Sequence, residues 1–202
     1  MTRAPTARLF AALEMPLPVR EALLGWSRGA LPALSHDAAR AREGSRDGVR
    51  LLDAELMHVT LCFLGARPVA EIDGLIAALT AFDGCSCELA LGAPVWLPPR
   101  NPCALTVAIT DDAGGLERLQ ARLALALALA SGWEPERRRF RAHVTVARLR
   151  GRRGGAAGLE GAVLPPTPAL RFSARTISLY RSRLSPAGAS YEVLASADLA
   201  DG

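Results

Sequence analysis

The chain has 202 residues, of which 50% are hydrophobic and 22% charged, and its formal net charge is +4. This length and apolar content can bury a substantial core, and they indicate one large domain or two small lobes. Because no run of about 18 apolar residues is present and the first residues lack the apolar stretch of a signal peptide, we expect a soluble cytoplasmic protein without a membrane partner. All 24 basic residues are arginine. P-loop, Schiff-base and lysine-nucleophile ligase mechanisms are therefore excluded, since each needs a lysine.

Hydrophobic periodicity and turn residues predict strands and helices in alternation. In chain order we expect a strand at 8–13, a helix at 19–31, strands at 49–52 and 58–64, a helix at 68–79, strands at 88–91 and 95–97 joined by a turn at 92–94, a strand at 104–109, a helix from 111–112 to about 130, and strands at 141–148, 170–172, 176–184 and 191–197. The remaining polar or Gly/Pro-rich segments are expected to be loops. Helices set between runs of short strands favour an α+β fold with largely antiparallel sheets.

One tetrapeptide, His58-Val59-Thr60-Leu61, recurs as His143-Val144-Thr145-Val146. The chain holds only three histidines and nine threonines, so two chance pairings at this spacing have a probability below about one in a hundred. If both segments are strands, each histidine shares a face with its threonine, and the apolar residues take the opposite face. We predict that the two motifs, one from each lobe, face a common cleft.

Two imidazoles on one cleft can divide proton transfer, because unperturbed histidine titrates near neutrality. One ring would protonate a leaving oxygen while the other takes a proton from water, and the two threonine hydroxyls would donate to phosphate oxygens. This chemistry suits a strained phosphodiester such as a 2′,3′-cyclic phosphate and needs no metal or covalent intermediate. Taken alone, either histidine is more typical of a satisfied core residue; the repetition favours the site. His36 has no such pattern and is interpreted as a surface residue.

Cysteines and arginines add two further expectations. The four cysteines, at 62, 85, 87 and 103, do not form a disulfide framework, and Cys85-x-Cys87 lacks zinc-ligand spacing, so we expect thiols and no structural metal. Cys62 would share the face of His58 in an ideal strand, which is a weak case for a nucleophile. Eight arginines between positions 137 and 153 surround His143. They suit phosphate binding, although the outer ones also fit a solvated charged loop.

The paired motifs resemble those of the 2H phosphoesterase superfamily, and their surroundings resemble the bacterial RNA 2′,3′-cyclic phosphodiesterases, the LigT-like or 2′-5′ RNA ligase-like family. The similar segments run nearly end to end: Arg8-Leu9-Phe10-Ala11 followed by Pro16, the block 58–65, the block 140–148, and a tail over 179–194 with Gly188 and Tyr191. The resemblance implies a single domain over 1–202 of two intertwined lobes, with two largely antiparallel sheets facing a central cleft, helices packed outside, and the His-x-Thr motifs related by a pseudo-twofold.

The resemblance also implies a reaction and the residues for it. A terminal 2′,3′-cyclic phosphate of RNA would be hydrolysed to a 2′-phosphate without a cofactor, with His58 as proton donor to the leaving 3′ oxygen and His143 as the base on water. Thr60, Thr145 and Arg148 would bind the phosphate. Arg148 stands five residues after His143, an odd offset that points to the opposite face of an ideal strand. Only a bulge, a strong twist or a strand end would bring it to the phosphate.

Two other functions remain open at this level. The chain could be a non-catalytic RNA-binding module, in which Phe10, Tyr180 and Tyr191 stack on bases, although core packing is more typical of Phe10. The reverse reaction, ATP-independent 2′-5′ RNA ligation, would be a side activity because mass action in water favours hydrolysis. The expected partners are RNA or nucleotides with 2′,3′-cyclic phosphate ends, and we expect a monomer.

Overall fold

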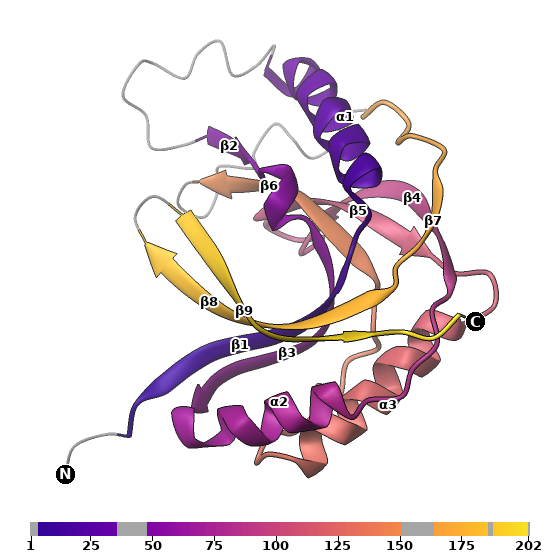
Figure 1. Cartoon of the computed structure of the whole chain (residues 1–202). Coiled ribbons are helices and arrows are strands. Elements are labelled where there is room, and N and C mark those ends of the chain that lie inside the picture. The colour runs from indigo at the N-terminus through magenta and orange to yellow at the C-terminus, as the bar shows by residue number, and fades with distance from the viewer. Residues whose placement is uncertain (1–3, 36–47, 151–163, 186–187, 202) are drawn as a thin grey trace.

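The computed structural model describes residues 4–35, 48–150, 164–185 and 188–201 (Figure 1). The elements found in these ranges are β1 (Thr6–Glu14), α1 (Leu17–Ser35), β2 (Gly48–Leu51), β3 (His58–Pro68), α2 (Ile72–Thr80), β4 (Glu88–Leu97), β5 (Ala104–Thr110), α3 (Gly115–Leu129), β6 (His143–Arg150), β7 (Arg171–Ser173), β8 (Thr176–Ser185) and β9 (Gly188–Asp198), with short 3₁₀ turns at Ala54–Leu56 and Val69–Glu71.

The strands form one sheet in the order β7-β4-β5-β6-β3-β1-β8-β9. The short strand β2 also pairs with β6, along residues 147–150, beyond the point where β6 pairs with β3. Neighbouring strands in this order are antiparallel. The predicted α+β fold with antiparallel pairing is therefore confirmed. The two expected sheets are halves of this one sheet, and they join where Val59 of β3 pairs with Val144 of β6. The two His-x-Thr motifs thus lie on adjacent strands.

The helices cover the apolar faces of the sheet. Figure 1 shows α2 and α3 side by side, and α2 contacts β8 and β9 while α3 contacts β3. Helix α1 lies at the other end of the molecule, against β2 and β6. In α3 the alternating Leu and Ala also fit a strand, yet the segment is helical because Leu119, Leu123 and Leu127 then point together into the core. Leu125 and Leu129 remain exposed on the other side.

One predicted turn is wrong. We expected the chain to reverse at 92–94 between two short strands, but β4 continues through this segment along β5. Its register shifts between Leu91 and Pro94, which marks a bulge in a continuous strand. A Cβ on Gly92 would lie 3.2 Å from the Cβ of Ala108, so glycine permits the close approach of β4 to β5.

No helix among the described residues is long and apolar enough to cross a membrane.

Candidate active site

The register of β3 against β6 brings the two motifs together. Because the strands are antiparallel and Val59 pairs with Val144, the same register sets His58 opposite Thr145 and Thr60 opposite His143. Side chains directly opposite one another have Cβ atoms about 4.5–5.5 Å apart, and diagonal neighbours are about 7–8 Å apart. The two histidines are such a diagonal pair. All four side chains lie on one face of the sheet, which we call the site face.

The same backbone irregularity follows each motif. Thr60 pairs with Ala12 and Cys62 with Ala11, so Leu61 is an extra residue in β3. In β6, Thr145 pairs with Thr106 and Ala147 with Leu105, so Val146 is an extra residue there. Each bulge reverses the alternation of side chains along its strand. The fifth residue after each histidine, Phe63 in β3 and Arg148 in β6, therefore lies on the site face.

These bulges settle two questions from the sequence. In β6 the bulge brings Arg148 to the site face despite its odd offset, and Arg148 lines the same cavity as His58. In β3 it turns Cys62 into the core, where the side chain is 2% exposed and burial raises the pKa of the thiol to about 12. The prediction that Cys62 shares the face of His58 is therefore wrong. Phe63 takes that place and is 40% exposed.

Both histidine rings are hydrogen-bonded to the backbone two residues earlier. His143 donates from Nδ1 to the carbonyl oxygen of Arg141 at 2.8 Å, and the ring of His58 bonds to the backbone of Leu56. A carbonyl only accepts hydrogen bonds, so the bonded nitrogen of His143 carries a proton and Nε2 is free to accept or donate one. In both motifs the backbone bond occupies one ring nitrogen and leaves the other for chemistry.

Aromatic side chains surround His58. Phe10 stacks on its ring at a centroid distance of 4.9 Å, Tyr180 stacks on Phe10 at 4.9 Å, and Tyr191 meets His58 edge-on at 5.3 Å. The Tyr180 hydroxyl donates to Glu14 at 3.2 Å, which ties the stack to the end of β1. Phe10 is only 4% exposed, so it supports His58 and offers little surface to a base. Tyr191 does line the cavity.

The surroundings of His58 lower its pKa from 6.5 to about 4. Burial is the largest cause, since desolvation disfavours the charged ring, and the positive charges of Arg148 and His143 add to it. The hydrogen bond to Leu56 acts in the opposite direction. His58 is therefore neutral at neutral pH in the free protein, and the charge of Arg148 contributes to this.

A cavity of about 500 Å³, which we call the first cavity, opens over His58 and Thr60. Three arginines, Arg8, Arg50 and Arg148, line it. Arg50 of β2 pairs directly with Arg148 of β6, and within the described part of the chain neither has a carboxylate partner. Like charges held opposite one another are unfavourable unless an anion lies between them. This wall is therefore suited to a phosphate.

Sequence reasoning missed Arg50. It stands between Val49 and Leu51 in a short strand, and a single charge in an otherwise apolar strand was the available signal. The partner strand could not be deduced from the sequence, so nothing linked Arg50 to Arg148. The sequence analysis named Arg8 only as part of the segment 8–11 that resembles the RNA cyclic phosphodiesterases, and gave it no role in the site. In the structure its guanidinium lies 4.8 Å from the centre of the Phe63 ring.

A second cavity, of about 330 Å³, is lined by His143 and also by Thr60. The two cavities share Thr60 and Phe63. Thr145 is half-buried opposite Thr106 and lines neither of these cavities. His36, Arg152 and Arg153 lie outside the described residues. Within the described ranges, no group of three or more His, Cys, Asp and Glu side chains could hold a metal ion.

Comparison with known proteins gives matches in sequence and in fold. The family described as LigT-like phosphoesterase matches residues 107–191, which include the second motif. The chain is 32% identical over 107 residues to the RNA 2′,3′-cyclic phosphodiesterase of Aeropyrum pernix, and the match covers 52% of this chain and 60% of that protein. The chain thus spans less than two thirds of this curated relative.

Two crystal structures are similar over nearly the whole chain. A protein of Thermus thermophilus is 24% identical with a TM-score of 0.70, covering 96% of this chain and 98% of its own. LigT of E. coli, solved in complex with 3′-AMP, is 20% identical with a TM-score of 0.71, covering 96% and 99%. At these identities the two structures establish the fold alone.

Proposed function

This chain resembles the LigT-like phosphoesterases in sequence and in fold, and from that premise we propose that it is an RNA 2′,3′-cyclic phosphodiesterase. The observation that carries the proposal is the register of β3 against β6, which sets His58 and His143 diagonally on the site face with a threonine opposite each. The arginine pair Arg50 and Arg148 supplies the charge that a phosphate needs. The name of the Aeropyrum pernix relative supports the same substrate.

The proposed reaction uses only groups of the site face. The cyclic phosphate binds between the two rings, with the Thr60 hydroxyl and the Arg148 guanidinium donating to its non-bridging oxygens. In the reacting form the pair carries one extra proton, which lies on His58 while the His143 ring is neutral. His143 takes a proton from the attacking water, the bond from phosphorus to the 3′ oxygen breaks, and His58 gives its proton to that oxygen. The product is a 2′-phosphate with a free 3′ hydroxyl. All these groups come from one chain, so we propose that the enzyme acts as a monomer.

The direct test is turnover of purified protein on RNA that ends in a 2′,3′-cyclic phosphate, with EDTA present. We expect hydrolysis to a 2′-phosphate product in EDTA, because two histidines can move both protons of the reaction. The position of the phosphate on the product is read by ³¹P NMR or by resistance to a 3′-specific phosphatase. Loss of turnover in EDTA that one divalent ion restores would contradict the two-histidine mechanism.

The pH dependence follows from the lowered pKa of His58. The active form of the pair carries one proton, whichever ring holds it, and a second proton inactivates the pair. Since the pKa of His58 is about 4, that second proton binds only in strong acid. We expect the acid limb of kcat/KM near pH 4, and measurement from pH 3.5 to 8 checks it. An acid limb near pH 6.5, the ordinary pKa of histidine, would show that the surroundings of His58 do not lower its pKa.

Non-catalytic RNA binding is the competing function, and the same turnover assay decides between the two. ATP-independent 2′-5′ ligation would use the same groups in the same direction, with an RNA 5′ hydroxyl in place of water as the nucleophile on the cyclic phosphate and the 3′ oxygen again as the leaving group. We propose it only as a side activity, since water at about 55 M competes with any RNA hydroxyl.

A further inference from the structure

The first cavity holds more positive charge than a cyclic phosphate needs. Arg8, Arg50 and Arg148 line it, and none of the described residues in its walls is a carboxylate. A 2′,3′-cyclic phosphodiester carries one negative charge, and in the proposed reaction Thr60 and Arg148 already contact its two non-bridging oxygens. Arg8 lies over the Phe63 ring. The proposed reaction therefore leaves Arg50 without a defined contact.

Strand pairing holds Arg50 against Arg148. Arg50 of β2 is the direct partner of Arg148 of β6. Just beyond this pair, the backbone nitrogen of Leu52 donates to the carbonyl oxygen of Val146, the extra residue of the β6 bulge, at 2.9 Å. Leu52 is only 8% exposed, so this end of the segment is anchored in the core. The bulge that turns Arg148 to the site face is thus tied to the strand that carries Arg50, and both arginines are held on one wall before a ligand binds.

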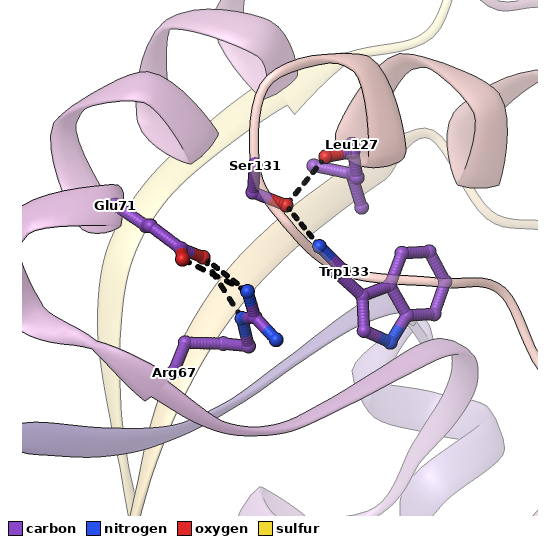
Figure 2. Close-up of polar contacts among 5 residues, drawn as sticks. All are labelled: Arg67, Glu71, Leu127, Ser131 and Trp133. Atoms are coloured by element: carbon purple, nitrogen blue, oxygen red, sulfur yellow. Dashed lines mark hydrogen bonds and ion pairs between the residues drawn. The ribbon is translucent and has the colours of Figure 1, made fainter.

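Arg67 shows how a structural arginine is neutralised in this chain. Figure 2 shows its guanidinium donating to both carboxylate oxygens of Glu71, at 2.6 and 2.9 Å. Arg50 and Arg148 have no such partner in the part of the chain that the structure describes, although like charges directly opposite one another are destabilising. An anion bound between them would offset this repulsion, and the more charge it carries, the more it offsets.

Hydrolysis changes the charge of the bound phosphate. The cyclic diester has two terminal oxygens and one negative charge. The 2′-phosphomonoester has three terminal oxygens and, because its second pKa is about 6, a charge of about −1.5 to −2 at neutral pH. One guanidinium group matches the diester, whereas two opposed guanidinium groups match the monoester.

We propose that Arg50 is a specificity-determining residue that makes the site bind the dianionic 2′-phosphomonoester more tightly than a monoanionic phosphodiester. This inference rests on the proposed function, since it takes the product of that reaction as the ligand. With Arg50 and Arg148 both on the phosphate, the product dissociates slowly, because differences in affinity at one site lie mostly in the dissociation rate. Phosphomonoesters are then competitive inhibitors of the enzyme.

The test measures binding without turnover, by calorimetric titration at about pH 7.5 with adenosine 2′-phosphate, a dianion, and with its methyl diester, a monoanion of the same nucleoside. We expect the wild-type protein to bind the monoester at least about tenfold more tightly, the effect of one charge-assisted contact. Arg50→Gln should lose this preference, whereas Arg50→Lys keeps the charge and should retain part of it. The methyl group is the same for every variant, so a change in the preference reports on charge. Equal affinities in the wild type, or an unchanged preference in Arg50→Gln, would overturn the inference.

Arg171→Gln is the matched control. It removes one positive charge from β7 at the edge of the sheet, where Arg171 pairs with Asp112 at 3.2 Å, and it should leave the preference unchanged. An equal loss in Arg50→Gln and Arg171→Gln would show a general charge effect and overturn the inference. Turnover is scored separately: failure to hydrolyse a cyclic phosphate contradicts the proposed function, while the binding preference still tests the role of Arg50.

Discussion

Replacing either His58 or His143 by alanine is expected to lower kcat/KM on a cyclic mononucleotide by about 10²–10⁴-fold. In the proposed reaction each ring transfers one of the two protons, and neither threonine can substitute for it, because a hydroxyl does not titrate near neutrality. In that reaction the two rings act as a unit on one phosphate. The double variant should therefore be little worse than either single variant, instead of showing the product of the two losses.

His36 supplies the matched control, because it is the third histidine and has no threonine two positions later. His36→Ala should retain wild-type kcat/KM. Circular dichroism and thermal unfolding of each variant separate a loss of catalysis from a loss of fold. Turnover of His58→Ala or His143→Ala close to that of the wild type would remove that histidine from the mechanism, and independent losses that multiply in the double variant would mean that the two rings do not act together.

The sequence was sufficient for the parts of the site that depend on local periodicity. Side chains alternate along a strand, so the spacing of two between each histidine and its threonine predicted a common face without knowledge of the partner strands. The order of elements likewise predicted the antiparallel α+β fold, because short strands joined by turns pair locally. The helix of α3 followed from its length and alanine content.

The parts that depend on strand pairing could not be predicted. A bulge is a property of two strands in register, and nothing in the identity of Leu61 or Val146 distinguishes an extra position from an ordinary one. The face of Cys62 was therefore predicted wrongly, and the face of Arg148 stayed open. Arg50 enters the site only because β2 pairs with the end of β6, which is a contact between segments about 100 residues apart in the chain.

The second large expected effect is that of replacing Arg148, which the bulge at Val146 turns to the site face, where we propose that the phosphate binds. Arg148→Ala is expected to lower kcat/KM on a cyclic mononucleotide by about 10²-fold, the loss typical of one donor to developing negative charge. Arg148→Lys should recover only part of this, since an ammonium cannot reproduce the bidentate guanidinium contact. A mononucleotide has no further RNA backbone, so the effect reports on the reacting phosphate. Arg152→Ala, in the outer part of the arginine run, serves as the control and should be nearly unchanged.

A second measurement on the same variant separates a contact with the phosphate region from a structural effect. The charge of Arg148 is one of the causes that lower the pKa of His58. Removing that charge raises the pKa of His58, so the acid limb of kcat/KM in Arg148→Ala should move from about pH 4 to higher pH, whereas a loosened fold at a distance would leave it in place. If Arg148→Ala matches the wild type in both rate and acid limb while Arg152→Ala falls, the phosphate is held by a different arginine of the run that surrounds His143.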